Sequence, residues 1–555
     1  MYVFQTLLLF LLPLLSSSQT LSVDVREATI SSLHTSLYAG LTTCREIVSA
    51  FLARIEHFNP SINAIITLNP YALDIADSLD ESLSRGNATG PLFCIPILLK
   101  DNYDALPMAT TGGCLALNSS MPTHDSATVT AFRRAGAVIL GKTNLHELAL
   151  EGLTVSSLGG QTLNPYDFSR TPGGSSGGTG AAIAASFAVL GTGTDTANSL
   201  RSPASANNLF SFRPTRGLIS RAGVLPVTYT QDVVGAFGRC LMDIATALTV
   251  MASVGYDATD NATSAIPPSV IGTDYTTFLT LGHASNLSGT RIGVIESFFN
   301  RTRSDETDPV NRAMDNVISL LRAQGATVIS INDPMTYNIT AIGAEIDVQR
   351  LEYRELLTNY LSSPDLQGRR PLNMAQLYMP NPTDPQFLVI PTQYSYIETS
   401  LVSSTSNISY FARQSQIANL TRAVHTTLLS NDLTCLIYPE QKNLVVPVGS
   451  PSQTGRNGPL AALTGDPVVT IPVGFSPATA SAPIGIPIGM EIYGLPWTEG
   501  NLLGVAKAID DRMHMRKMPV TGRLNDIVEV SRAMTQVPSI TPLNNIPSSY
   551  PLGVY

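Results

Sequence analysis

The sequence predicts an α/β fold on three observations. Short apolar runs alternate with glycine-rich turns across residues 91–250, which is typical of strands and helices that follow one another. The same alternation returns after residue 433. Of the 555 residues, 44% are hydrophobic and only 14% are charged, so the chain is not of the disordered class.

The charge balance limits the partners. Lys and Arg number 33 and Asp and Glu 42, which makes the formal net charge −9. Nucleic-acid binding needs a basic surface, so this balance excludes nucleic acid as the main partner. A large acidic globular enzyme fits the composition, and we expect residues 19–555 to form a single catalytic domain.

Residues 1–18 are predicted to be a secretory signal peptide. Val3 to Leu15 are nearly all apolar, and Ser16 to Ser18 supply the small residues that a signal peptidase accepts. The apolar stretch is shorter than the roughly 20 residues of a membrane span. A retained anchor is the alternative. We expect a protein that is secreted or resides in the secretory lumen, with no stable membrane span after signal removal.

Asn-x-Ser/Thr sequons add to the expectation of a secreted glycoprotein. The chain has eight of them, at Asn87, Asn118, Asn261, Asn286, Asn300, Asn338, Asn407 and Asn419.

The five cysteines are an odd number, so at least one is free or pairs between chains. Their spacing matches no zinc or CxxC pattern, and no metal site is predicted. Which of them pair is left open.

The first predicted elements are helical and lie in residues 21–90. The segment 42–58 has apolar residues at helical spacing, with Thr43 as N-cap and Glu46 completing a capping box. In the centre, 92–99 and 137–140 are predicted strands, and the Ala-rich segment 181–190 a buried helix.

The second half continues the pattern. Residues 340–430 are predicted to be helical and polar, with a break at 380–386. The tail 516–555 is expected to wrap the surface. The remaining predictions are strands within 291–295, 326–331, 434–440, 465–475 and 484–494, and helices over 308–322 and 499–511.

Three short motifs suggest other chemistries and are set aside. GAVILGKT (136–143) fits the P-loop pattern, but its four middle residues are those of a strand. GGSSG (173–177) fits the nucleophile elbow, but a loop precedes it instead of a buried strand. His146-Glu147 begins HExxH, but Leu150 stands at the second histidine.

The segment 172–201, PGGSSGGTGAAIAASFAVLGTGTDTANSLR, places two glycine-rich loops around an Ala-rich stretch. The first loop carries Ser175 and Ser176, and the second carries Ser199. The two loops can meet only if the chain folds back after the stretch. From the residues alone, plain Gly/Ser turns are an equal alternative.

Several segments follow one another in a fixed order, and together they resemble the amidase signature family. The likeness covers most of 40–510 and is weakest across 255–430. Around 159–166 the sequence is similar to peptide-amidase-type members. The resemblance implies a secreted, fungal-like or peptide-amidase-like protein. The implied fold is a mixed β-sheet core covered by helices on both faces. The segments are PLFCIPILLKDNYD (91–104), TTGG (110–113), AGAVILGKTNLHELA (135–149), GGQTLNPY (159–166), the serine-rich run, RPTRGLISRAGVLP (213–226) and LTGDPVVTIPVGF (463–475).

The resemblance also implies the catalytic residues. Ser199 stands at the nucleophile, Ser175 at the bridging serine that follows a cis peptide bond, and Lys100 at the catalytic lysine. A buried lysine loses part of its affinity for the proton, so a neutral Lys100 could draw a proton from Ser175, and Ser175 one from Ser199. A surface ion pair between Lys100 and Asp101 is the alternative.

Supporting residues follow from the same likeness. Backbone N–H groups of Thr196, Ala197, Asn198 and Ser199 are expected to hold the oxyanion. The family has two glycines where Ala197 and Asn198 stand, and a backbone with positive φ would tolerate alanine poorly. Ala149 is expected to line the acyl side of the substrate pocket, and Ser175 is also expected to be a substrate-binding residue. Asp195 and Arg201 are expected to brace the loop.

The implied function is hydrolysis of a carboxylic amide C–N bond through an acyl-enzyme on Ser199, without cofactor or metal. The substrate would be a small-molecule or peptide amide, and a homodimer is left open. Ester cleavage or acyl transfer by the same residues, or a noncatalytic binding protein, are alternatives. A tRNA-dependent amidotransferase component is disfavoured by the signal peptide and the acidic charge. Residues 340–430 are expected to decide specificity: an apolar helical pair there would indicate a lipid amide, a polar cleft a peptide or small amide.

Overall fold

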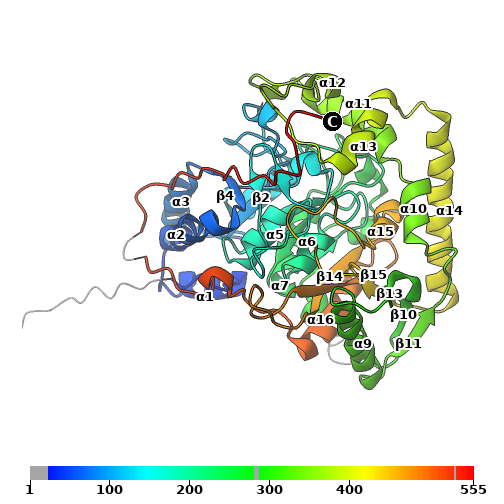
Figure 1. The fold of residues 1–555 in the computed structure, drawn as a ribbon. Helices are drawn as coiled ribbons and strands as arrows, with labels where there is room; N and C mark the ends of the chain where they lie inside the picture. Colours follow the sequence, from blue (N-terminus) through cyan, green and yellow to red (C-terminus); the bar gives the residue numbers. More distant parts are fainter. Residues whose placement is uncertain (1–22, 281–286, 531–532) are drawn as a thin grey trace, which may run out of the picture.

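A mixed sheet of eleven strands runs through the protein (Figure 1). The computed structural model describes residues 23–280, 287–530 and 533–555. Neighbouring strands are parallel in β4-β2-β7 and in β13-β10-β11 and antiparallel elsewhere. In sheet order the strands are β1 (Ile65–Leu68), β4 (Val138–Thr143), β2 (Pro96–Lys100), β7 (Leu190–Asp195), β9 (Val233–Gly238), β8 (Phe210–Arg213), β14 (Val468–Phe475), β15 (Pro487–Tyr493), β13 (Cys435–Pro439), β10 (Arg291–Ile295) and β11 (Thr327–Ile331).

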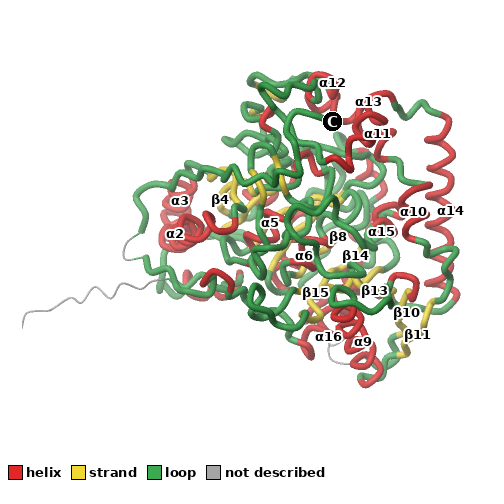
Figure 2. The backbone as a smooth tube through the Cα atoms, in the orientation of Figure 1, coloured by secondary structure: helices red, strands yellow, loops and turns green. Residues whose placement is uncertain are grey.

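Helices flank this sheet, which confirms the predicted α/β/α fold (Figure 2). Two further strand pairs are small, β3 (Met121–Pro122) with β12 (Leu366–Gln367) and β5 (Val155–Ser156) with β6 (Gly160–Gln161). The α-helices are α1 (Ile30–Tyr38), α2 (Cys44–Ile62), α3 (Ala72–Ser84), α4 (Ala127–Arg134), α5 (Gly177–Ala184), α6 (Arg201–Ala206), α7 (Leu241–Ala252), α8 (Thr277–Thr280), α9 (Asp308–Ala323), α10 (Ile339–Glu345), α11 (Gln349–Leu361), α12 (Met374–Leu377), α13 (Tyr394–Val402), α14 (Ile408–Ser430), α15 (Pro459–Thr464) and α16 (Glu499–Met513).

The predicted capping box is present at the start of α2. The Thr43 hydroxyl accepts from the Glu46 N–H at 3.1 Å, and a Glu46 carboxylate oxygen accepts from the Thr43 N–H at 2.9 Å. The helices predicted within 21–90 are α1, α2 and α3. Strand β1 lies between α2 and α3 and was not predicted, because its four residues are too few to show a period.

The strands and helices predicted after residue 290 agree with the structure to within a few residues. Their apolar runs are bounded by turns, so periodicity alone locates them. The predicted break at 380–386 is also present, since these residues, all of them described, contain no helix.

The prediction of a single helix over 181–190 is wrong. Helix α5 ends at Ala184, Ser186 has φ +59°, and Leu190 already begins β7. The apolar run is shared between a helix and a strand, and a short uniform run does not show where one ends. The chain reverses here, so that β7 runs beside β2.

The segment resembling a P-loop forms β4, which pairs with β1 and β2 inside the sheet. Its backbone groups belong to the sheet, so they do not cradle a phosphate. The rejection of that motif is therefore correct.

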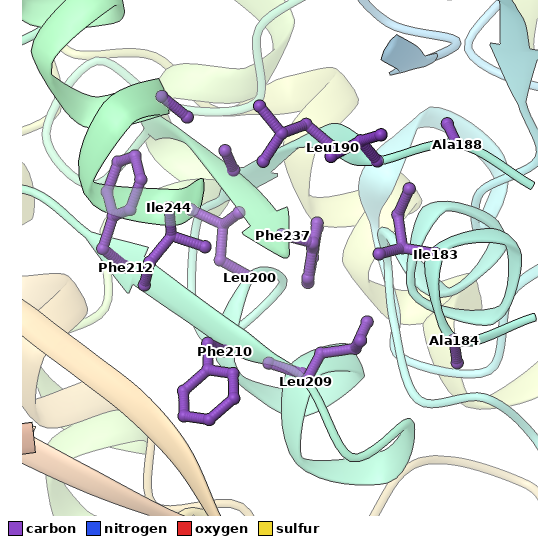
Figure 3. Close-up of a cluster of buried hydrophobic side chains, with 14 of the residues drawn as sticks. Ile183, Ala184, Ala188, Leu190, Leu200, Leu209, Phe210, Phe212, Phe237 and Ile244 are labelled. Carbon is purple, nitrogen blue, oxygen red and sulfur yellow. The ribbon is translucent and has the colours of Figure 1, made fainter. Parts of the chain in front are cut away.

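A hydrophobic cluster lies directly behind the second glycine-rich loop (Figure 3). Leu200, the residue after Ser199, is fully buried beside Phe237. A Cβ at Gly193 or Gly235 would lie 2.8 or 2.7 Å from a Leu200 methyl carbon. These two strand glycines therefore make room for the leucine that anchors the loop.

Cys44 and Cys94 form a disulfide between residues 50 positions apart. It joins the start of α2 to the segment that leads into β2 and Lys100. Closing a loop of this length constrains the unfolded chain by about 4 kcal/mol in the chain-entropy model. Cys114, Cys240 and Cys435 are free. Within the described ranges no three metal-binding side chains gather into a cluster.

The C-terminal tail runs along the N-terminal half of the chain. The N–H groups of Met534 and Leu543 donate to Ser49 and Asn63 at 2.9 and 3.0 Å.

In the described residues no helix has the length and apolarity needed to cross a membrane. The predicted signal peptide 1–18 and the sequon at Asn286 lie outside the described residues.

Candidate active site

Lys100 is the last residue of the inner strand β2, and its side chain is fully buried. Its Nζ donates to Ser175 Oγ at 2.8 Å and to Thr194 Oγ1 at 2.7 Å. Its backbone N–H donates to Thr192 Oγ1 at 3.0 Å. Asp101 pairs instead with Lys142, at 3.2 Å, so the alternative of a Lys100–Asp101 surface ion pair is wrong.

Burial lowers the pKa of Lys100 to about 7, although the charges of Asp195 and Asp232 act in the opposite direction. Among the described residues no carboxylate lies within 4.0 Å of the ammonium group. The lysine therefore exchanges its proton near neutral pH, as a general base requires.

Ser175 lies two residues before the start of α5, and backbone contacts position it. The Gly174–Ser175 peptide bond is cis. The His146 N–H donates to the Ser175 carbonyl at 3.0 Å. A Cβ at Gly174 would lie 2.7 Å from Thr154 Oγ1, so only glycine fits before the serine.

Residues 196–199 form the loop between β7 and α6. Their four backbone N–H groups donate to no acceptor in the described part of the chain. Ser199 is 6% exposed, and its hydroxyl likewise has no described hydrogen-bond partner. Neither Ala197 nor Asn198 has a positive φ, so alanine in place of the family's glycine is tolerated without backbone strain.

Asn198 has a specific partner. Its Nδ2 donates to Glu440 Oε1 at 3.1 Å. Burial and the charge of Glu491 raise the pKa of Glu440 to about 8. Gly458 packs on the same loop, where a Cβ would lie 2.3 Å from the Asn198 Cβ. The residue that departs from the family pattern is thus accommodated by its surroundings.

Asp195 and Arg201 form a buried ion pair around the loop, with 3.1 Å between Oδ1 and NH2. Asp195 Oδ2 also accepts from the Leu200 N–H at 3.0 Å. Arg201 NH1 binds Glu491 at 2.8 Å, and Arg213 NH1 binds Asp195 at 2.8 Å. Despite burial, the two guanidinium groups lower the pKa of Asp195 to about 2. The cluster ties both ends of the loop to β8 and β15.

A pocket of about 610 Å³ opens at Ser199. Ala149 forms part of its wall, with φ +64°. One side carries the ion pair Arg456–Glu151, with 3.0 Å between NH2 and Oε1. The other side comes from the predicted specificity region and is polar, with Asp347, Gln349, Arg350, Gln393, Thr399, Asn407 and Arg413.

Comparison with known proteins accounts for this arrangement. The family model described as Amidase matches residues 46–503. The chain belongs to the amidase family. As an amidase, it is an enzyme that acts on amide C–N bonds, and the predicted family is confirmed.

Individual relatives of this amidase are similar over nearly their whole length. A glutamyl-tRNA(Gln) amidotransferase component from Chloroflexus aggregans is 30% identical over 513 residues, covering 87% of this chain and 96% of the relative. The native peptide amidase structure from Stenotrophomonas maltophilia has a TM-score of 0.77 and 30% identity, covering 89% and 99% of the two chains.

Sequence reasoning missed several residues of this site. Thr192 and Thr194 alternate along β7, so both face Lys100, and their period-two spacing was the available signal. Glu440 and Glu491 had no such signal, because they contact Asn198 and Arg201 from more than 230 residues away along the chain.

Proposed function

We propose that this amidase hydrolyses peptide or small polar amides in the secretory pathway or outside the cell, with Ser199 as nucleophile and Ser175 and Lys100 as its proton relay. The observation that carries the proposal is the 2.8 Å contact between Lys100 Nζ and Ser175 Oγ in a fully buried setting.

The proposed mechanism has four steps. Neutral Lys100 takes the hydroxyl proton of Ser175. Ser175 in turn takes the hydroxyl proton of Ser199, once the Ser199 hydroxyl has rotated toward Ser175. The Ser199 oxygen attacks the amide carbon, and the unpaired N–H groups of residues 196–199 hold the oxyanion. The relay returns the proton to the leaving amine, and water then releases the acid.

The polar pocket supports the substrate class. Charged and amide side chains line the side that residues 340–430 contribute. Burying a long apolar chain against them would leave these groups without water or partners, which is costly. A peptide or small polar amide can satisfy them.

Two structural features support secretion. The Cys44–Cys94 disulfide is typical of oxidising compartments. The seven described sequon asparagines are all exposed: Asn87, Asn118, Asn261, Asn300, Asn338, Asn407 and Asn419.

The pH profile tests the relay. Because the pKa of Lys100 is lowered to about 7, the base is protonated below that pH and neutral above it. We expect kcat/KM for a peptide amide to rise about tenfold per pH unit below about 7 and to level off above it. Glu440→Gln, which keeps an acceptor for Asn198, should leave this inflection in place. The role of Lys100 would be contradicted if the Glu440→Gln variant shifted the pH of the inflection. It would also be contradicted if kcat/KM fell as the pH rises from 5 to 8.

The substrate class is tested with matched amides. We expect kcat/KM for a C-terminal peptide amide to exceed that for a long-chain fatty-acid amide by about 10-fold or more, since one lost polar contact of about 1.4 kcal/mol gives that factor. Competition between the two amides for the same enzyme measures the ratio directly. Preference for the fatty-acid amide would refute the assignment.

An amidotransferase role is the second candidate, because similar proteins are components of amidotransferases. The net charge of −9 disfavours a tRNA partner. Stimulation of amide turnover by tRNA or by an added partner protein would favour this role.

A further inference from the structure

The sequon Asn407-Ile408-Ser409 lies at the start of the long helix α14, which forms one edge of the molecule in Figure 1. Asn407 is exposed and lines the same pocket as Ser199. A group attached to this asparagine would therefore stand beside the route to the nucleophile.

The local geometry leaves the reactive nitrogen of Asn407 free. Its Oδ1 caps α14 by accepting from the N–H and the hydroxyl of Ser409, both at 3.0 Å. Its Nδ2 donates to no described residue. A modification at Nδ2 would keep the cap and remove no hydrogen bond.

Three apolar side chains close to Asn407 along the chain are exposed. Val402, Ile408 and Phe411 are 83%, 85% and 64% exposed. Residues four apart on a helix share a face, so Phe411 lies next to the Asn407 cap. A bulky polar group attached to Asn407 would lie beside these apolar side chains and reduce their exposure to solvent.

We propose that Asn407 carries an N-linked glycan that covers these apolar side chains and narrows the pocket entrance, so that long peptide amides are disfavoured relative to small amides. The effect on selectivity rests on the proposed function, and the attachment rests on passage through the secretory pathway. A glycan is bulky and solubilising, and it suits an exposed asparagine beside apolar side chains.

The sugar donor for this attachment is a lipid-linked oligosaccharide pyrophosphate. The Nδ2 of Asn407 forms a bond to the anomeric carbon of the sugar. The bond from that carbon to the pyrophosphate oxygen breaks, Nδ2 gives up one proton, which passes to solvent, and the lipid pyrophosphate leaves.

The test uses the full chain expressed in a secretory eukaryotic host, with two variants of one residue. Ser409→Ala removes the sequon and keeps Asn407, whereas Ser409→Thr keeps both the sequon and the hydroxyl. Glycopeptide mass spectrometry reports occupancy of Asn407. The ratio of kcat/KM for a long peptide amide to kcat/KM for a small amide measures how far the glycan narrows the pocket entrance.

We expect the glycopeptide in the wild type and in Ser409→Thr, and its absence in Ser409→Ala. The ratio should rise several-fold in Ser409→Ala and after enzymatic deglycosylation of the wild type, and stay unchanged in Ser409→Thr. An unmodified Asn407 in the wild type overturns the proposal, as does a ratio that deglycosylation leaves unchanged. A wild type that hydrolyses neither amide refutes the proposed function instead, because mass spectrometry measures occupancy without activity.

Discussion

Replacing Ser199 with alanine is expected to lower kcat/KM for a peptide amide by about 10⁴-fold or more, the scale seen when a covalent nucleophile is removed. Ser199 lies at the pocket, beside four backbone N–H groups that have no acceptor among the described residues. Without its oxygen no acyl-enzyme forms, although the oxyanion donors remain. Lys100→Ala should cause a comparable loss, because it removes the base.

The matched control is Ser202→Ala. Ser202 is a buried serine three residues further along, and its hydroxyl has no hydrogen-bond partner in the described structure. We expect near wild-type rates from it. A fluorophosphonate probe should add its mass to Ser199 in the wild type and in Ser202→Ala, and not in Ser199→Ala. Wild-type turnover by Ser199→Ala would refute the mechanism.

Replacing Arg201 with alanine is expected to reduce the free energy of unfolding by about 3–5 kcal/mol, the cost of breaking a buried ion pair by removing one partner. Arg201 is fully buried and binds both Asp195 and Glu491. Without Arg201, two carboxylates stay buried. Asp195 keeps its ion pair with Arg213, whereas Glu491 loses its guanidinium partner. Urea unfolding measures the change.

Activity should fall in the same variant. Arg201 NH2 donates to the Ala197 carbonyl, and Asp195 accepts from the Leu200 N–H, so the cluster positions the oxyanion loop from both ends. Arg303→Ala is the control, because the Arg303 side chain is 91% exposed and its pair with Asp308 should contribute less than about 1 kcal/mol. Equal stability of the two variants would contradict a structural role for Arg201.

Many helices and strands were predictable because local sequence patterns determine them. The capping box of Thr43 and Glu46 and the strand–helix–strand run β10-α9-β11 depend on residues near one another in the chain. Strand β1 and the end of α5 were not predictable. A four-residue strand shows too little period, and a uniform apolar run hides the change from helix to strand.

The sequence by itself determined the family, through the order of its motifs, and the positions proposed for catalysis, Lys100, Ser175 and Ser199. Only the tertiary structure decided their chemistry. The pKa of Lys100 is low because β2 lies between β4 and β7, where the amine is fully buried. Glu440, which directly follows β13, contacts Asn198 because β13 lies in the same sheet as β7. Desolvation and long-range contacts depend on which distant segments pack together, and local sequence does not record that.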